Sequence, residues 1–345
     1  MKNIKFDYND ITIYPSDNSS PISSRKEITI EYNPLIVSPM DTVINKNNYN
    51  YYLSNNLNIC IPRNEDIDNL ADIYTGYKFI SISLDEAFEL INNRELYIRK
   101  YENKYLTQFL IDIANGHMQK LVDIVKQFKL KYPSSTLMVG NIANPNMYKI
   151  LSEVGADFIR CGIGAGNACT TSANGGIHYP MGSLITECYE ISKTLKDPAK
   201  IVADGGIRNY SDIIKALALG ADYVMIGSLF NKMIESCGDN YFLNIKINQK
   251  LAEFLYRKFN FKIYKKFRGM STKEVQRKWN KQKLTTSEGI VKKQLVEYTL
   301  EKWLENFFDY LKTNMSYCGK NKLHNFIGKV NFCFITENAY KRFNK

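Results

Sequence analysis

The chain has 345 residues, of which 44% are hydrophobic and 23% charged, as in typical globular proteins. No apolar run is long enough to span a membrane, and the N-terminus lacks the apolar core of a signal peptide. The seven cysteines include no CxxC pair, and the three histidines are far apart. This composition argues against a disulfide scaffold and a zinc site, and it predicts a reduced, cytoplasmic location.

The formal net charge is +11, with dense basic stretches at 262–266 and 278–283. A nucleic-acid surface, a site for phosphorylated ligands and a solvated lysine-rich surface are all compatible with this charge. The solvated surface is the simplest of the three explanations. We therefore expect neither a nucleic acid nor a membrane as partner.

Eight short apolar runs follow one another along the chain, and several are separated by helix-like segments. The runs are 34–39, 57–61, 79–83, 109–113, 136–140, 158–161, 201–204 and 223–227. Near-continuous apolar strands indicate a parallel sheet that is buried on both faces. Eight such units in about 200 residues predict an α/β fold of the TIM (β/α)8 barrel type, and a doubly wound open sheet is the alternative.

Helix signals lie between and after these runs. Pro145 suits a first helical turn and Gly155 a helix end, which predicts a helix over 145–155. Residues 211–220 repeat the pattern, with Ser211 as N-cap. Apolar residues at helical spacing predict a further amphipathic helix over 294–311.

We expect one domain over residues 1–345. Barrel strands occupy about 35–228, and a C-terminal helix and tail occupy about 292–345. The polar segment between them, 271–289, almost lacks an apolar stripe and predicts a mobile active-site flap.

In a barrel, the side chains that follow the strands build the active site. The polar residues and glycines at these places are Asp41, Arg63, Asp112, Asn115, Asn141, Gly164, Asp204, Gly205, Gly206, Gly227 and Ser228. Two of the pairs, Gly205-Gly206 and Gly227-Ser228, follow the seventh and eighth strands, where barrels commonly bind phosphate. Two tight turns are the structural alternative.

Residues 162–171 read Gly-Ile-Gly-Ala-Gly-Asn-Ala-Cys-Thr-Thr and directly follow the sixth strand. The glycines allow the backbone to close around a ligand or ion. Cys169 on such a loop can act as a nucleophile, and the neighbouring threonine hydroxyls can handle a proton. A βα turn with a buried thiol is the alternative.

These residues together resemble the IMP dehydrogenase / GMP reductase family from about residue 5 to residue 335. The matching motifs are 164–171, 204–206, 216–221 leading to 225–228, 268–271 and 287–289. The resemblance implies a (β/α)8 barrel, a purine mononucleotide substrate, a nicotinamide cofactor and a homotetramer. It also implies K⁺ bound by the backbone carbonyls of Gly164, Gly166 and Cys169.

The reductase branch of this family is the better match. Dehydrogenases usually carry a pair of regulatory CBS domains after the second barrel strand, and the link between Ile61 and Phe79 is too short for them. The flap residues Arg277-Lys278-Trp279 do not match the Arg-Tyr pair of dehydrogenases. Residues 111–116 look like the reductase version of the fourth strand. The implied reaction is the NADPH-dependent conversion of GMP to IMP with release of ammonia.

Three alternatives remain open. They are an IMP dehydrogenase without regulatory domains, a reductase of another purine nucleotide, and a non-catalytic relative that binds nucleotides or nucleic acid.

The resemblance also implies roles for individual residues. The implied catalytic residues are Cys169, Thr171 and Glu288. The implied substrate-binding residues are Asp204, Gly205, Gly206, Gly227, Ser228, Gly269, Met270, Ser271, Ser287 and Gly289. The implied cofactor-binding residues are Ser24, Arg25, Arg63, Asp112, Ile113, Ala114, Ile163, Gly164, Tyr317, Cys318, Gly319 and Lys320.

The chain also departs from the family. It has Asn167 where the family usually has serine, and Thr285 where reductases usually have arginine. The connection 240–264 is longer than usual.

Overall fold

The computed structural model describes residues 4–17, 22, 24–63, 65, 76–101, 107–166, 170–278 and 289–343. Eight parallel strands form a closed barrel in which each strand pairs with the next and the last closes on the first. They are β2 (Leu35–Val37), β3 (Asn58–Ile61), β4 (Lys78–Ile82), β5 (Gln108–Asp112), β6 (Thr136–Ile142), β7 (Phe158–Cys161), β8 (Lys200–Asp204) and β9 (Tyr223–Ile226). The predicted TIM barrel is confirmed, and no CBS domain is evident in the described ranges.

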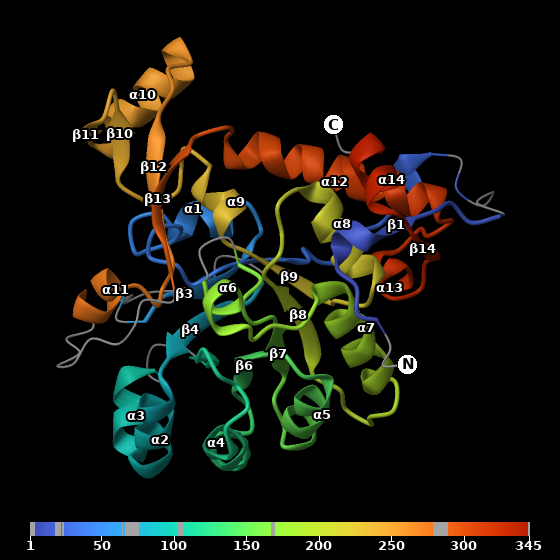
Figure 1. The fold of residues 1–345 in the computed structure, drawn as a ribbon. Coiled ribbons are helices and arrows are strands. Elements are labelled where there is room, and N and C mark those ends of the chain that lie inside the picture. Colours follow the sequence, from blue (N-terminus) through green and yellow to red (C-terminus); the bar gives the residue numbers. More distant parts are fainter. Residues whose placement is uncertain are drawn as a thin grey trace.

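Helices surround the barrel (Figure 1) and cover its outer face with one continuous apolar core. They are α1 (Tyr49–Ser54), α2 (Leu84–Asn92), α3 (Arg94–Lys100), α4 (Gln119–Lys131), α5 (Pro145–Glu153), α7 (Met181–Ser192), α8 (Tyr210–Ala218) and α12 (Leu300–Tyr317). Two short helices, α6 (Thr171–Gly175) and α9 (Ser228–Asn231), follow β7 and β9 directly.

The inside of the barrel is filled by side chains rather than by solvent. Aromatic rings meet there: the Phe158 ring centroid lies 4.8 Å from that of Tyr77, 5.2 Å from that of Phe79 and 5.5 Å from that of Tyr223. Because this interior is apolar, polar chemistry is confined to the loops at the ends of the strands.

The helix after β8 begins two residues earlier than the sequence predicts. Asn209, not Ser211, is the N-cap of α8, and its side-chain oxygen accepts a hydrogen bond from Asp212 N at 3.0 Å. Asn209 has the extended backbone that an N-cap needs, whereas Ser211 already lies in the first turn. The other predicted helix is confirmed: α5 starts at Pro145, and Gly155 follows its end with φ +99°.

The predicted helix over 294–311 is wrong at its start. Residues Val291–Leu295 form strand β13, which pairs with β12 (Tyr264–Arg268), and the helix α12 begins only at Leu300. Tyr298 belongs to the connection, where its hydroxyl donates to Leu229 O at 3.0 Å. Backbone pairing with β12 therefore overrides the helical spacing of the apolar residues in this stretch.

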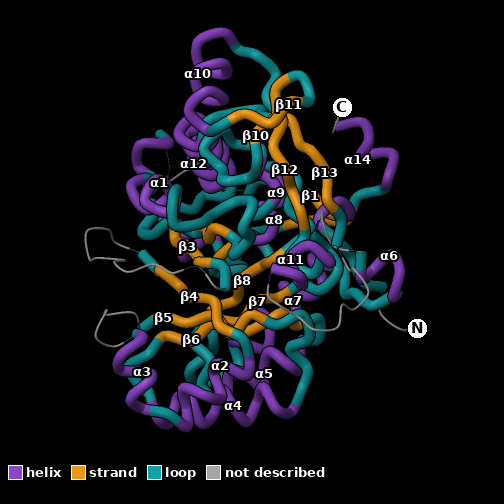
Figure 2. Tube along the Cα trace, turned by 90° about the vertical axis from the view of Figure 1, so that its left-hand side faces the viewer, coloured by secondary structure: helices purple, strands orange, loops and turns teal. Residues whose placement is uncertain are grey.

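The long connection after β9 builds a separate feature that we call the arm, residues 240–268 and 291–295. It contains β10 (Asn240–Phe242), β11 (Ile245–Ile247) and α10 (Gln249–Phe259), and its antiparallel sheet has the order β11-β10-β12-β13. Figures 1 and 2 show the arm projecting from the barrel, with α11 (Lys273–Lys278) at its base. A small cluster of buried residues, Ile234, Ala252, Ile263 and Val296, packs beneath α10.

The two ends of the chain meet on the opposite side of the barrel. The turn η1 (Tyr8–Asp10) leads into β1 (Ile11–Ile13), which pairs with β14 (Phe332–Phe334). The turn η2 (Arg25–Glu27) precedes the barrel, and α13 (Leu323–Phe326) and α14 (Glu337–Phe343) flank β14. Lys215 of α8 donates to Tyr8 O at 2.9 Å and ties the N-terminal segment to the barrel wall.

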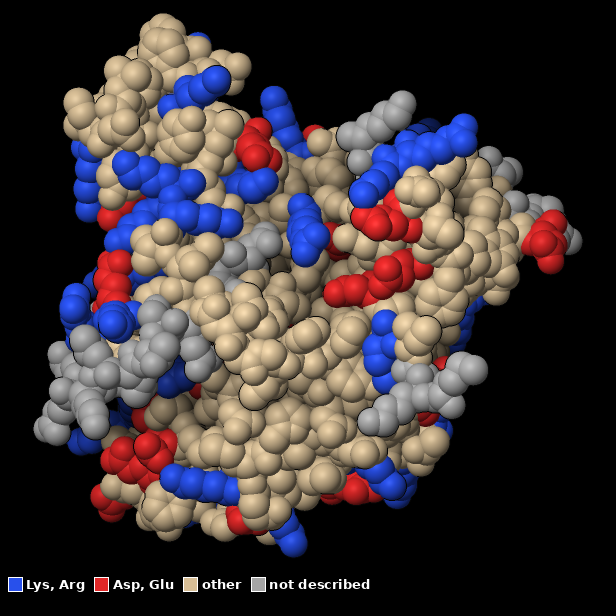
Figure 3. Space-filling model, in the orientation of Figure 1, with Lys and Arg blue, Asp and Glu red and all other residues tan. Residues whose placement is uncertain are grey.

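Basic residues are unevenly spread on the face seen in Figure 3. Lys and Arg side chains gather over the arm, whose strands carry Lys246, Lys266, Lys292 and Lys293. No helix in the described part of the chain is both long enough and apolar enough to cross a bilayer.

Candidate active site

A buried arginine connects two of the predicted site residues at the mouth of the barrel. Arg160, on β7, is 6% exposed. Its Nη1 lies 2.7 Å from Asp112 Oδ1, and its Nη2 lies 2.7 Å from Asp204 Oδ2. The guanidinium of Arg160 thus bridges Asp112, which the resemblance implies for cofactor binding, and Asp204, which it implies for substrate binding.

Further donors complete this network. Asn141 Nδ2 donates to Asp204 Oδ2 at 2.7 Å and to Gly162 O at 2.8 Å, and Arg63 donates to the backbone oxygen of Asp112. Burial lowers the pKa of Arg160, but the charges of Asp204 and Asp112 outweigh burial and raise the pKa above its usual value. The contacts of Arg63 and Arg160 therefore hold Asp112 and Asp204 in a fixed geometry.

Sequence analysis did not single out Arg160. The available signal was a charged residue inside the apolar run 156–161, because a charge inside a buried strand needs a partner. Two partners, Asp112 and Asp204, were already among the predicted residues.

The loops that follow β7 and β8 lie against each other. Gly206 N donates to Ala165 O at 2.9 Å. A Cβ added at Gly205, whose φ is +121°, would lie 3.0 Å from the Ala165 Cβ. The two loops approach this closely because glycine stands at 205.

A hydrogen bond connects the two ends of the loop that carries the predicted nucleophile. Ser172 Oγ donates to Gly164 O at 2.8 Å, and Thr171 is the first residue of α6. Two predicted catalytic residues, Cys169 and Glu288, lie outside the described residues, as do Asn167, Ser287 and Thr285.

The strands of the arm bring the ends of the predicted flap together. Gly269 N donates to Ile290 O at 3.1 Å, which places Gly269, Met270 and Ser271 beside Gly289. Arg268 Nη2 lies 2.6 Å from Asp41 Oδ2, in the loop after β2.

The end of β9 lies against the same loop after β2. A Cβ at Gly227 would be 2.8 Å from the sulfur of Met40. We call the ends of β12 and β13 next to the flap the neck of the flap. The Gly227-Ser228 turn and this neck therefore both contact the loop after β2.

The predicted cofactor residues fall into two groups. The group at the barrel mouth follows β3, β5 and β7 and consists of Arg63, Asp112, Ile113, Ala114, Ile163 and Gly164. The other group lies at the C-terminal end of α12 and consists of Ser24, Arg25, Tyr317, Cys318, Gly319 and Lys320. In this second group Arg25 Nη1 donates to Thr313 Oγ1 at 3.1 Å, and the Cys318 side chain is buried.

Comparison with known proteins places the chain among its relatives. A family model described as "IMP dehydrogenase / GMP reductase domain" matches residues 98–343. A GMP reductase of Ligilactobacillus salivarius is 33% identical over 68% of this chain and 73% of its own length. A GMP reductase of Staphylococcus carnosus is 29% identical over 97% of this chain and 98% of its own length.

Inosine-5'-monophosphate dehydrogenases are similar over a shorter part. Those of Chlorobaculum parvum and Chlorobaculum tepidum are 32% and 33% identical over 66% of this chain. The chain spans only 44% of the length of each. From the barrel, the shared motifs and the extent of the family match, we conclude that the chain belongs to the IMP dehydrogenase / GMP reductase family.

Proposed function

We propose that the chain is a GMP reductase, which converts GMP to IMP and ammonia with NADPH as reductant. The observation that carries the proposal is the match in length. The chain corresponds to nearly the whole of the S. carnosus reductase but to less than half of the two dehydrogenases. Residues 62–77 alone connect β3 to β4, which leaves no room for an inserted regulatory domain.

The proposed chemistry starts with the thiolate of Cys169 adding to C2 of GMP. The 2-amino group gains a proton and leaves as ammonia, so that the purine stays bound through C2 to the sulfur. NADPH, when bound, supplies the hydride that takes the place of the amino group at C2. The C2–S bond then breaks and returns the thiolate to Cys169, and IMP is released. A thiolate suits this role because it is both a strong nucleophile and a competent leaving group.

Asp204 is prepared to hold the ribose. Its Oδ2 accepts hydrogen bonds from Arg160 Nε, Arg160 Nη2 and Asn141 Nδ2, at 3.1, 2.7 and 2.7 Å. Within the described residues Oδ1 has no donor, so it is the oxygen that we assign to a ribose hydroxyl. Gly205, Gly227 and Ser228 would hold the phosphate through backbone N–H groups, and Gly206, whose N–H donates to Ala165 O, would border it.

The proton for the leaving amine is assigned to Thr171 and Glu288. Thr171 is fixed at the start of α6, next to the hydrogen bond that connects the two ends of its loop. Glu288 belongs to the flap, whose neck lies against the loop after β2, so closure of the flap would bring the dyad together. Closure would also exclude water, which would otherwise hydrolyse the purine adduct. Gly269, Met270, Ser271, Ser287 and Gly289 would then border the base.

The residues present fit NADPH. Asp112 is held by Arg160 at the barrel mouth, where the nicotinamide must meet C2. Arg25 supplies a guanidinium suited to a phosphate, and Tyr317 beside it is 62% exposed. The Cys318 side chain is buried, and its backbone N–H already donates to Asn314 O, so neither is available to a ligand. We also propose that the reductant is NADPH rather than NADH, that the protein is located in the cytoplasm and that it forms a homotetramer.

K⁺ is proposed at the carbonyls of Gly164, Gly166 and Cys169. Among the described residues, the Gly164 oxygen accepts one hydrogen bond, from Ser172 Oγ, and a carbonyl oxygen has two lone pairs. One lone pair is therefore left for a cation, so this carbonyl fits the site. Replacing K⁺ by Na⁺ in the assay buffer should lower turnover.

The decisive test follows absorbance in two reactions with the purified chain, one with GMP and NADPH and the other with IMP and NAD. We expect oxidation of NADPH and release of ammonia in the first. Cys169→Ala should abolish turnover and leave GMP binding largely intact. Glu288→Gln should slow ammonia release more than hydride transfer.

The other outcomes would change the assignment. Formation of XMP from IMP and NAD would make the chain a dehydrogenase without regulatory domains. No turnover in either reaction would contradict the proposal and favour another purine nucleotide or a binding function. Substantial activity of Cys169→Ala would overturn the thiol mechanism.

A further inference from the structure

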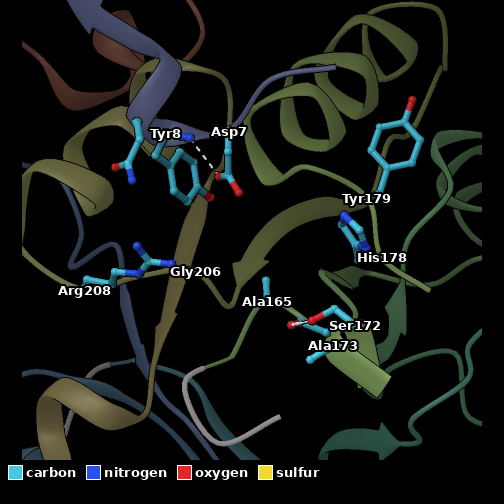
Figure 4. A pocket seen from close by; sticks show the side chains of 11 residues that line it. Asp7, Tyr8, Ala165, Ser172, Ala173, His178, Tyr179, Gly206 and Arg208 are labelled. Atoms are coloured by element: carbon cyan, nitrogen blue, oxygen red, sulfur yellow. Dashed lines mark hydrogen bonds between the residues drawn. The ribbon is translucent and has the colours of Figure 1, made fainter. Parts of the chain in front are cut away.

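A pocket of about 380 Å³ lies on the outer side of the loops that follow β7 and β8. The described residues that line it are 7–9, 164–165, 172–173, 178–179, 206 and 208 (Figure 4). Its volume is within the range of small-molecule sites. No described lining residue comes from the end of β9 or from the neck of the flap. The pocket shares Gly164 and Gly206 with the proposed nucleotide site, and its other described lining residues lie outside that site.

At the pocket lies a buried hydroxyl that has no partner. Tyr8 is 2% exposed, and its hydroxyl makes no hydrogen bond within the described residues. The backbone of Tyr8 is fully engaged, because its N–H donates to Asp7 Oδ1 at 2.7 Å and its oxygen accepts from Lys215 Nζ at 2.9 Å. Burial, helped by the Asp7 charge, raises the pKa of Tyr8, so the hydroxyl stays a donor. An unsatisfied buried donor is costly unless something binds it.

Charged and polar groups surround this hydroxyl. In Figure 4 the side chains of Tyr8, Arg208 and His178 point into the same space from three sides. Arg208 and His178 are exposed, and their side chains make no hydrogen bond or ion pair with any other described residue. Asp7 adds a carboxylate, of which one oxygen is used by Tyr8 N. Tyr179 differs, since its hydroxyl points away and donates to Glu187 Oε2 at 2.8 Å.

We propose that this pocket binds a compact organic anion that also carries hydroxyl groups, as sugar phosphates do. The anionic group faces Arg208 and His178, because a guanidinium suits phosphate oxygens. The ligand hydroxyls face Asp7 and Tyr8, where one group accepts and the other donates. A simple anion matches the pocket less well, since the Asp7 carboxylate would repel it.

The ligand would touch the backs of two loops implied in catalysis. Gly206 N is bonded to Ala165 O, and Ser172 Oγ is bonded to Gly164 O, so the wall of the pocket consists of these loops. This binding is proposed independently of GMP reduction, and its test does not depend on the reductase assay.

The test is calorimetric titration of the full chain with ribose 5-phosphate. We expect Tyr8→Phe and Arg208→Gln each to weaken binding about tenfold, the effect of losing one good hydrogen bond or charge contact. Tyr179→Phe is the matched control, because it removes a hydroxyl that faces away, and its affinity should equal that of wild type. The Tm of Tyr8→Phe without ligand should not fall, since the Tyr8 hydroxyl makes no hydrogen bond within the described residues.

Three results would overturn the proposal. The first is a failure of wild type to bind ribose 5-phosphate. The second is binding by Tyr8→Phe and Arg208→Gln as tight as that of wild type, which would place the ligand elsewhere. Equal affinity for inorganic phosphate would contradict the assignment of Asp7 and Tyr8 to ligand hydroxyls.

Discussion

The mouth of the barrel and the arm both place charged side chains on strands, but they use them differently. At the mouth, Arg160 is buried between Asp112 and Asp204 and forms an ion pair with each of them. The strands that carry these three residues are paired on both sides and are covered by helices. The mouth is therefore held by the whole barrel, and we expect it to lose its geometry only when the barrel unfolds.

The arm is attached through polar contacts at its base. Asn231 Nδ2 donates to Thr42 O at 2.8 Å and to Lys266 O at 3.0 Å. Arg257 Nη2 of α10 donates to Glu235 Oε1 at 2.6 Å. The apolar cluster beneath α10 has four buried members, of which Ala252 and Ile263 belong to the arm. The arm can thus open locally while the barrel stays folded, and because β12 and β13 form the neck of the flap, such opening would move the flap.

The largest effect expected is that of Arg160→Met. The change leaves Asp112 and Asp204 without their shared partner in a largely buried place, which typically costs about 3–5 kcal/mol of unfolding free energy. Urea unfolding followed by circular dichroism would measure it. Arg160→Lys should recover only part of the loss, because an ammonium cannot bridge two carboxylates as a guanidinium does.

The matched control lies at the other end of β8. Lys200 forms a surface ion pair with Asp222 at 3.1 Å, and Lys200→Met should cost less than about 1 kcal/mol. Equal losses in Arg160→Met and Lys200→Met would show that the mouth is no more rigidly held than the surface.

Removing a core side chain from each region compares them directly. Phe158→Ala inside the barrel should cost about 3–5 kcal/mol and shift the global unfolding transition. Ile263→Ala in the arm removes a fully buried side chain as well, but we expect faster hydrogen exchange confined to β10–β13 and α10. A global transition shifted equally by both changes would mean that the arm and the barrel unfold together.

The same division explains how much of the fold the sequence predicts. All eight barrel strands were found as apolar runs, since a strand buried on both faces carries a signal in every residue. The arm was noticed only as an unusually long connection. Its strands are short and half exposed, and the pairing of β13 with β12 joins residues that are separated by the whole flap. Local spacing therefore predicted a helix at 294 where tertiary pairing makes a strand.

The candidate site divides in a similar way. Asp112, Asn141 and Asp204 lie at the carboxyl ends of their strands and could be predicted as site residues from these positions alone. The bridge made by Arg160 could not, because the sequence does not say which strand ends face one another across the barrel. The sequence also could not predict that the Tyr8 hydroxyl lacks a hydrogen-bond partner among the described residues, since this depends on the burial of the Tyr8 ring beside Gly206.

Lys265, a buried lysine of the arm, should make the stability of the protein depend on pH. Burial lowers the pKa of Lys265 from 10.5 to about 8. Between these values the unfolded chain holds a proton that the folded chain has lost, so unfolding free energy should rise with pH by at most about 1.4 kcal/mol per pH unit. Below pH 8 both states are protonated, and Lys265 adds no pH dependence.

The measurement is urea unfolding from pH 8 to 10.5 for wild type and Lys265→Met. Burial raises the pKa of the Cys237 thiol to about 12, which acts in the opposite direction above its ordinary value. The difference between the two proteins is therefore the quantity to compare. Parallel pH profiles would contradict the burial of a charged Lys265.

The smallest effects come from two helix caps with the same chemistry. Asn209 accepts from Asp212 N at 3.0 Å in the barrel helix α8, and Asn248 accepts from Leu251 N at 2.8 Å in the arm helix α10. Changing either residue to alanine should cost about 1 kcal/mol. We expect Asn209→Ala to lower the Tm of the whole chain, and Asn248→Ala to leave that Tm unchanged while amide exchange in α10 becomes faster.

Ser211→Ala is the control for this pair, because Ser211 is the residue that the sequence pattern suggests as the cap of α8. The structure makes Asn209 the cap, so Ser211→Ala should change stability by less than about 0.5 kcal/mol. A larger loss of stability in Ser211→Ala than in Asn209→Ala would show that Ser211 is the N-cap of α8, as the sequence pattern predicts. An equal drop in Tm for Asn209→Ala and Asn248→Ala would instead show that α10 is as much a part of the cooperative fold as α8, since one lost cap can lower the global transition only from within it.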